Sequence, residues 1–378
     1  MDIVKKRKLV KTLVYGLFFA LILAVLMVID SQNDATDMII VVLKKAAVYA
    51  VIAVSMNLLN GFTGLFSLGQ AGFMLLGAYT YGVLTMTNDA RTIVYYLTGY
   101  AVKFTLPWWL GMILAGAVAA FFAFLIGLPV LKLKSDYLAI ATLGFAEIVR
   151  AFAQWDKLAP VTNGSIQLRD YPTFSAYSML EGTIFEEMTL TPFVLIAALC
   201  ILLVVLLIRS TYGRAFKAIR DDEVAAEAMG IDLAHHKRLA FVTSSFFAGI
   251  GGALLAIFQS SITASQFKSS MTYEILLIVV IGGIGSITGS VLASFLYVAC
   301  SEWWLRFLDG GTLFGITLPD KVFRGGFRMV VFSVIIMIIV LFFRKGIMGD
   351  RELNLDFIVN LFVKDKKKNK KGKEDSAQ

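Results

Sequence analysis

Cysteine, histidine and charge are all scarce in this chain. Two cysteines and two histidines occur among its 378 residues, and charged residues make up 16%. Cys200 and Cys300 both lie within apolar runs, at a spacing that fits neither a disulfide framework nor a metal site. We therefore expect both thiols to be buried as small apolar side chains.

Motifs for catalysis are also missing. His235 and His236 are adjacent, so they do not converge on one metal ion, and with so few histidines, both in one loop, no Ser-His-Asp arrangement can be argued. No G-x-x-x-x-G-K-[ST] sequence occurs, so the chain is not expected to bind and hydrolyse ATP through a P-loop. We expect a protein that is not an enzyme and binds no cofactor or metal itself.

Apolar residues dominate instead, at 58% of the chain. A soluble domain of this size could not hide that much apolar surface. Several apolar runs reach the roughly 20 residues that cross a bilayer as a helix, which predicts an all-α, polytopic transmembrane bundle. About ten segments are expected, some short or broken, near residues 10–29, 39–60, 67–86, 107–131, 137–155, 190–208, 239–259, 273–285, 287–306 and 327–343. The first run is longer than a signal-peptide core and lacks an A-x-A-like site after it, so it is expected to stay as a span.

Basic residues gather at the two ends and in one long loop, giving a net charge of +8. The positive-inside rule then predicts that both termini are cytoplasmic. We expect a basic N-terminus (1–8), a transmembrane domain (9–345) with a cytoplasmic loop at 209–238, and a disordered basic tail (346–378). The basic ends are expected to meet anionic lipid rather than nucleic acid.

The segment from Leu58 to Tyr79 is apolar but interrupted by five glycines and several polar residues. A bilayer tolerates broken backbone only where protein or a watery cavity covers it, so this span is expected to line a transport path. Alternatively, its polar side chains bond one another across a helix interface. The path candidates are Asn60, Gly61, Thr63, Gly64, Ser67, Gly69 and Gln70.

Glu147 and Arg150 lie three residues apart in the fifth predicted span, so they share a helix face. Ionised side chains at membrane depth are costly and indicate function, and this pair could meet a zwitterionic amino acid. The alternative, which we favour, is that the two charges neutralise each other. Both residues are retained as path candidates.

A second glycine-rich run spans Ile281–Ser290. Its spacing does not match a dinucleotide-binding loop. Two compatible interpretations remain: close helix contact through Gly285 and Gly289, or a break at Gly282, Gly283 and Gly285 that forms a cytoplasmic turn. Ser245, Gly249 and Ala253 form another small-residue stripe suited to helix packing.

The loop 209–238 contains signals for one short helix. Asp221 or Asp222 can cap free N–H groups, Glu223 suits the positive helix end, and Gly230 follows where a left-handed residue ends a helix. Such a helix is too short to be stable alone in water. It would present Val224, Ala225, Ala228 and Met229 on one side, which suggests docking against another protein.

Four stretches, in order, carry a family resemblance: LNGFTGLFSLGQAGFMLLGAY, LKLKSDYLAIATLGFAEIVRA, GRAFKAIRDDEVAAEAMGI and GGIGSITGSVLASFL. Over roughly residues 45–345 the chain resembles branched-chain amino-acid ABC transporter permeases of the LivM type. The resemblance implies an importer in a bacterial inner membrane, with a second related permease, two ATPase subunits that hold ATP and Mg, and an extracytoplasmic solute-binding protein. The implied ATPase-docking residues are Asp222, Glu223, Ala225, Ala226, Met229 and Gly230.

Other functions remain as alternatives. Urea and short-amide permeases share this pattern, so the cargo could be urea rather than Leu, Ile or Val. From another class, an ion-coupled secondary transporter or channel would need a chain of intramembrane carboxylates. Since only Glu147 is expected to be deep and acidic, we disfavour that class.

Overall fold

The computed structural model describes residues 23–30, 37–132, 135–174, 189–306, 312–313, 316–317, 327–342, 346–349 and 352. Its membrane-type helices are α2 (Met38–Asn57), α3 (Gln70–Thr85), α5 (Trp108–Val130), α6 (Ser135–Ala153), α8 (Thr191–Arg209), α11 (Leu233–Gln259), α12 (Ser269–Gly282), α13 (Ile287–Val298) and α14 (Phe327–Phe342). Every predicted segment from the second to the tenth overlaps one of them. The first segment lies largely outside the described residues.

Within these ranges, four helices are long and apolar enough to cross a membrane. They are α2 with the π-helical turn η1 (Leu58–Phe62), α5, α8 and α11. A fifth span would combine most of α6 with the segment 156–162, at a bend of 64°. α12 and the centre of α14 are apolar but shorter. The predicted all-α, polytopic membrane bundle with some short or broken segments is confirmed.

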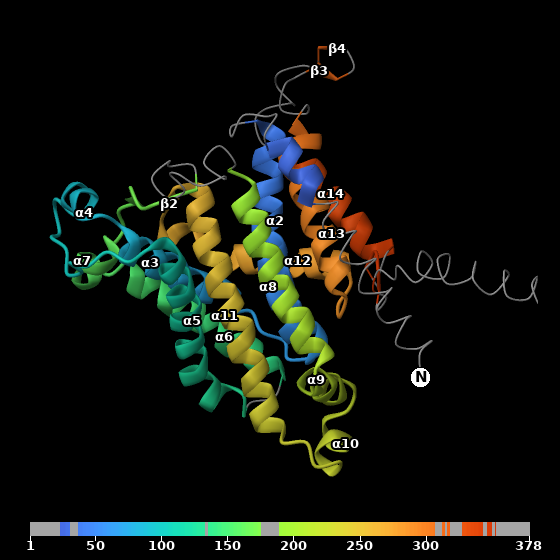
Figure 1. The fold of residues 1–378 in the computed structure, drawn as a ribbon. Helices are drawn as coiled ribbons and strands as arrows, with labels where there is room; N and C mark the ends of the chain where they lie inside the picture. The colour runs from blue at the N-terminus through green and yellow to red at the C-terminus, as the bar shows by residue number, and fades with distance from the viewer. Residues whose placement is uncertain are drawn as a thin grey trace, which may run out of the picture.

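α2 and α11 form the centre of the bundle. α11 packs along α5, α3 and α2, while α8, α12 and α13 cover the other sides of α2 (Figure 1). Glycines permit this packing: a Cβ on Gly77 of α3 would lie 2.0 Å from the carbonyl oxygen of Gly249 on α11. Gly249 in turn approaches the Ala115 backbone of α5. The predicted stripe of Ser245, Gly249 and Ala253 is buried at this crossing.

The connections gather at two ends of the bundle. The short helices α9 (Thr211–Asp221) and α10 (Glu223–Ala228) lie at one end, and α4 (Asn88–Val94) and α7 (Ala159–Thr162) lie toward the other (Figure 1). There β1 (Leu168–Arg169) pairs antiparallel with β2 (Ser261–Ile262). β3 (Thr312–Leu313) and β4 (Ile316–Thr317) form a second small ribbon.

Candidate functional site

The predicted break between the second and third spans is present. After α2 the chain widens into the π-helical turn η1, passes Gly64 in a left-handed conformation (φ +74°), and re-enters a helix at Gln70. Polar side chains satisfy the exposed backbone: the Ser67 N–H donates to Asn60 Oδ1 (3.2 Å), and the Thr63 hydroxyl donates to the Leu58 carbonyl (3.0 Å). The break is therefore stabilised by its own side chains, and contact of these residues with a cargo stays a prediction.

Asn57, the last residue of α2, joins this break to the second glycine-rich run. Its amide nitrogen donates to the Ser286 carbonyl (2.9 Å) and to Ser290 Oγ (2.7 Å), and its oxygen accepts from the Gly285 N–H (2.8 Å). The Asn57 side chain is fully buried. A Cβ on Gly61 would clash with both Asn57 and Gly285, so only glycine leaves room for this joint.

The second run forms a sharp turn between α12 and α13, with Gly283 and Gly285 at positive φ. Gly282 and Gly289 face each other across it, and a Cβ on Gly289 would lie 2.2 Å from the Gly282 carbonyl oxygen. The predicted turn is present. Of the two glycines predicted to make a close helix contact, Gly289 does so, against Gly282, whereas Gly285 lies in the turn before α13 begins.

Residues 346–349 and Glu352 also reach this turn. The Ile347 N–H donates to the Ile281 carbonyl (2.8 Å), and Glu352 Oε1 accepts from the Ile287 N–H (2.7 Å) at the start of α13. These residues belong to the stretch predicted as a disordered tail, yet they pack against the permease domain. The remaining tail, and the basic N-terminus, lie outside the described residues.

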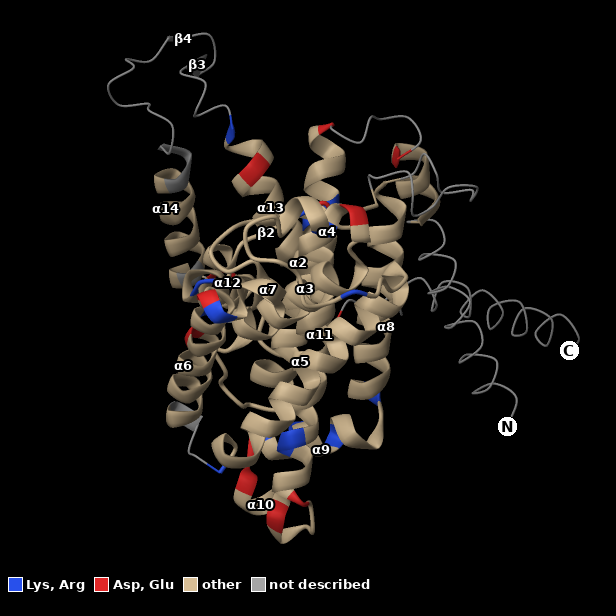
Figure 2. Cartoon of the chain, turned by 90° about the vertical axis from the view of Figure 1, so that its left-hand side faces the viewer, with Lys and Arg blue, Asp and Glu red and all other residues tan. Residues whose placement is uncertain are grey.

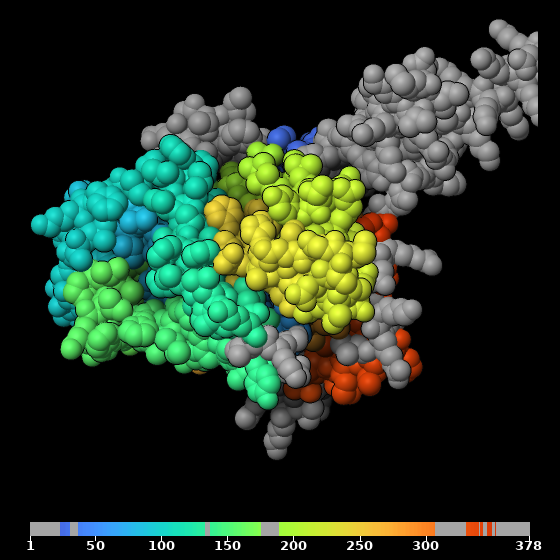
Figure 3. Space-filling model, turned by 90° about the horizontal axis from the view of Figure 1, so that it is seen from below, coloured from blue at the N-terminus to red at the C-terminus, as the bar shows by residue number. Residues whose placement is uncertain are grey.

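The short helix predicted in the cytoplasmic loop is α10. Asp222 caps it by accepting from the Val224 and Ala225 N–H groups (2.9 and 3.0 Å). Gly230 follows at φ +83°, and Lys237 bonds Glu223 (2.6 Å). Ala226 is buried, whereas the neighbouring apolar side chains project outward, Val224 at 77% and Met229 at 83% exposure. Seen from below, the segment 211–230 is open to view on this end of the molecule, beside the part formed by α5 and α6 (Figure 3).

One side chain links this loop to the break in the membrane. Arg220, at the end of α9, donates from Nη1 to the carbonyl oxygen of Gly61 (3.2 Å). A Cβ on Gly64 would lie 3.0 Å from the Arg220 side chain, and the Lys217 ammonium lies 5.6 Å from the centre of the Phe62 ring. Arg220 was not among the predicted residues, because nothing in its local pattern shows which backbone it reaches.

Glu147 and Arg150 do pair, as the favoured interpretation holds. Arg150 Nη2 lies 2.6 Å from Glu147 Oε2, and the Ser269 hydroxyl of α12 donates to Glu147 Oε1 (2.5 Å). Both charged groups are thus occupied by protein partners. Their contact with cargo stays a prediction.

Two further acidic residues lie within predicted membrane segments, so Glu147 is not alone there, and its depth stays a prediction. Glu274 lies in the second turn of α12 and is exposed, and Glu302 lies in η5 (Ala299–Trp304), the π-helical end of α13. Lys45 of α2 pairs with Glu302 at 2.5 Å. These charges sit near the ends of predicted segments, where sequence alone does not separate membrane from loop.

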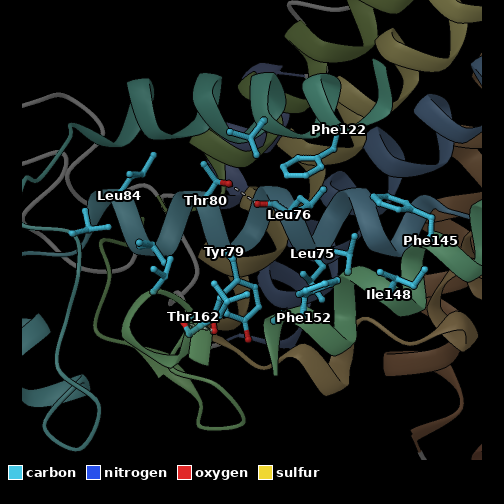
Figure 4. A pocket seen from close by; sticks show the side chains of 17 residues that line it. Leu75, Leu76, Tyr79, Thr80, Leu84, Phe122, Phe145, Ile148, Phe152 and Thr162 are labelled. Carbon is cyan, nitrogen blue, oxygen red and sulfur yellow. Dashed lines mark hydrogen bonds between the residues drawn. The ribbon is translucent and has the colours of Figure 1, made fainter. Parts of the chain in front are cut away.

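A cavity of about 640 Å³ opens between α3, α5, α6 and α7 (Figure 4). Its lining is largely aliphatic and aromatic, including Leu75, Phe122 and Phe152. The Thr80 hydroxyl is engaged with the Leu76 carbonyl (2.7 Å). The cavity thus suits an apolar chain rather than a charged cargo.

Comparisons with known proteins agree with this architecture. The family model described as branched-chain amino acid transport system / permease component matches residues 38–343. The chain is 32% identical over 274 residues to the high-affinity branched-chain amino acid transport system permease protein LivM of Salmonella typhimurium and to that of Escherichia coli. A probable LivM of Methanocaldococcus jannaschii is 26% identical over 289 residues, covering 69% of this chain and 80% of that protein.

The two bacterial matches cover 68% of this chain and 61% of each relative. No solved structure matches the chain significantly. The family match nevertheless extends from α2 to the end of α14 and includes the break, the α12–α13 turn and the α9–α10 segment. The chain belongs to the family of permease components of branched-chain amino acid transport systems.

Proposed function

We propose that this chain is one permease subunit of an ABC importer for branched-chain amino acids. Its partners would be a second related permease, two ATPase subunits that bind ATP and Mg, and an extracytoplasmic solute-binding protein. The α9–α10 end would face the cytoplasm together with both termini. The names of the relatives and the absence of a P-loop from the sequence support this division of labour.

The observation that carries the proposal is the contact between Arg220 and Gly61. α10 presents Val224 and Met229 outward, where an ATPase can dock, and α9 continues from it to the broken end of α2. Because Arg220 bonds the Gly61 carbonyl, a displacement of α10 and α9 would move the backbone of the break. Asn57 then passes that displacement to the α12–α13 turn. Movement of the docked ATPases would in this way reshape the two non-helical segments of the membrane domain.

Arg220→Ala tests this link. The variant loses a charge-assisted hydrogen bond, so we expect roughly three- to tenfold less leucine imported per ATP hydrolysed, with hydrolysis itself retained. The measurement is uptake and ATPase activity of the complex in proteoliposomes. Arg214→Ala, an exposed arginine on the same helix, is the matched control.

Docking is tested separately at Gly230 and Glu223. Gly230→Pro cannot adopt φ +83°, and it removes an N–H that donates to the Glu227 carbonyl (2.9 Å), so ATPase coupling should be lost. Glu223→Lys should also uncouple ATP hydrolysis from uptake. The double variant Glu223→Lys, Lys237→Glu restores the internal ion pair but not the negative charge at position 223. Full recovery in the double variant, or normal uptake in Gly230→Pro, would contradict the docking role.

An ATPase experiment on the wild-type complex identifies the cargo. Stimulation of ATPase activity by a binding protein loaded with Leu, Ile or Val supports the proposal, whereas stimulation by urea alone assigns the chain to the urea alternative. Active uptake by this chain without ATPase subunits would instead indicate a secondary transporter.

A further inference from the structure

Glu274 is an ionisable side chain on a short apolar helix, and it is exposed on the surface of this chain. Among the residues that the structure describes, none forms a hydrogen bond or ion pair with its carboxylate. α12 lies between α6 and α14 along one edge of the molecule (Figure 2). A carboxylate on an apolar helix is costly to expose to lipid, so this edge is expected to meet water or protein.

Charged and aromatic side chains lie around Glu274. Lys45 lies within electrostatic range of it and is itself bonded to Glu302. Tyr49 and Tyr297 stack with ring centres 6.4 Å apart, both within electrostatic range of Glu274, and the Lys45 ammonium lies 5.7 Å from the Tyr49 ring. The cluster thus combines an unpaired carboxylate, an ammonium and two aromatic rings from α2, α12 and α13.

This set of groups complements a zwitterion that carries an apolar side chain. A carboxylate accepts hydrogen bonds from an α-ammonium group, and charge-assisted bonds of this kind are the strong ones. An ammonium has three donors, so one bond to Glu302 leaves Lys45 donors for an α-carboxylate. Of the two tyrosines, Tyr49 is buried and Tyr297 is partly exposed, so the Tyr297 ring is the one that offers apolar contact.

We propose that Glu274, with the Lys45–Glu302 pair beside it, forms a binding site for the ammonium and carboxylate groups of an amino acid as it crosses the membrane. This inference rests on the proposed function and specifies where, within the permease, the cargo is held. It places the site on the α2–α12–α13 side of the bundle, away from Glu147 and Arg150, whose charges are already satisfied.

The test uses the full complex in proteoliposomes with L-leucine as the probe and a saturating loaded binding protein. Glu274→Gln keeps the shape of the side chain but loses its charge. We expect about tenfold fewer leucine molecules per ATP, with binding-protein-stimulated ATPase activity retained. Glu274→Asp should recover part of the loss. The control Asp89→Asn removes a charge from the exposed first turn of α4 and should behave as wild type.

Three outcomes would overturn the inference. Wild-type leucine transport per ATP in Glu274→Gln would remove Glu274 from the route. Loss of the second permease on co-purification of Glu274→Gln would assign this carboxylate to a subunit contact instead. Absence of ATP-driven leucine uptake by the wild-type complex would overturn the proposed function, and the site with it, whereas the first two outcomes leave the proposed function standing.

Discussion

Asn57 connects segments that lie 229 residues apart in sequence. Its amide uses both donor and acceptor capacity within the buried joint between the end of α2 and the α12–α13 turn. A buried amide group without hydrogen-bond partners carries the full free-energy cost of desolvation. The joint is therefore stable only when the end of α2 and the α12–α13 turn are both in place.

Removing that amide should destabilise the protein. Asn57→Ala leaves the Gly285 N–H without its acceptor and removes one of the donors to the Ser286 carbonyl, and we expect a loss of about 1–3 kcal/mol in the free energy of unfolding. Thermal unfolding of the purified protein in detergent measures it. Asn60→Ala, which removes two longer bonds to the Ser67 backbone, should cost less. Equal losses in both variants would contradict the special role of Asn57.

For single residues, the sequence predicted which polar side chains matter better than it predicted the groups to which they bond. Asn60, Thr63, Ser67 and Gln70 were recognised because polar residues interrupt an apolar run. Asn57 was passed over, since it looks like one polar residue inside a span and its partners are distant in sequence. Side-chain reach explains why Arg220 was missed as well: its acceptor is a backbone carbonyl 159 residues away.

The helices of the loop 209–238 are fixed by their caps. The cap of α10 was predictable, because Asp222 and Gly230 are local signals with a direct physical effect. The separate helix α9 was not predicted, and its packing against η1 depends on how the elements meet. Local chemistry thus sets where an element begins and ends, and tertiary contacts set what it touches.

The cap of α11 predicts a pH dependence. Asp232 accepts from the His235 N–H (3.0 Å), and this bond to the backbone lowers the pKa of the Asp232 carboxyl below its ordinary value of 3.8. A carboxyl with a lowered pKa in the folded state stabilises the fold above its ordinary pKa, and that contribution is lost as pH falls through the lowered value.

We therefore expect the first turn of α11 to loosen below about pH 4. Amide hydrogen exchange at His235, corrected for the intrinsic rate at each pH, reports the change. Asp232→Asn keeps an acceptor oxygen but does not titrate, so its protection should be independent of pH in this range. The same acid-dependent loss of protection in Asp232→Asn would show that another group is responsible.

For the whole molecule, close contact among α3, α5 and α11 holds the bundle together. The positions of the helices followed from the sequence, because the bilayer requires long apolar runs with satisfied backbones. Which helices pack against each other could not be predicted, because nearly every span is apolar on all sides. The glycines were the exception: a stripe such as Ser245, Gly249 and Ala253 predicted a packing face without naming the partner helix.

Gly77→Ala tests this packing. Its new Cβ would meet the Gly249 backbone, which cannot move aside as a side chain can, so α3 and α11 must separate. We expect a loss of about 1–3 kcal/mol or more in unfolding free energy, measured by thermal unfolding in detergent. Gly144→Ala, on α6 with open space around it, is the matched control and should be neutral or slightly stabilising. Comparable losses in the two variants would show that helix propensity, not packing, decides.

The joint at Asn57 also has a consequence for biosynthesis. A ribosome adds roughly 5–20 residues per second, so Ser286 follows Asn57 by about 10–45 seconds. During that interval the break emerges from the insertion machinery with its amide and glycine backbone unpaired. A nascent chain that stops before the α12–α13 turn never closes the joint, and quality-control proteases should recognise it by the polar gap left in its second span.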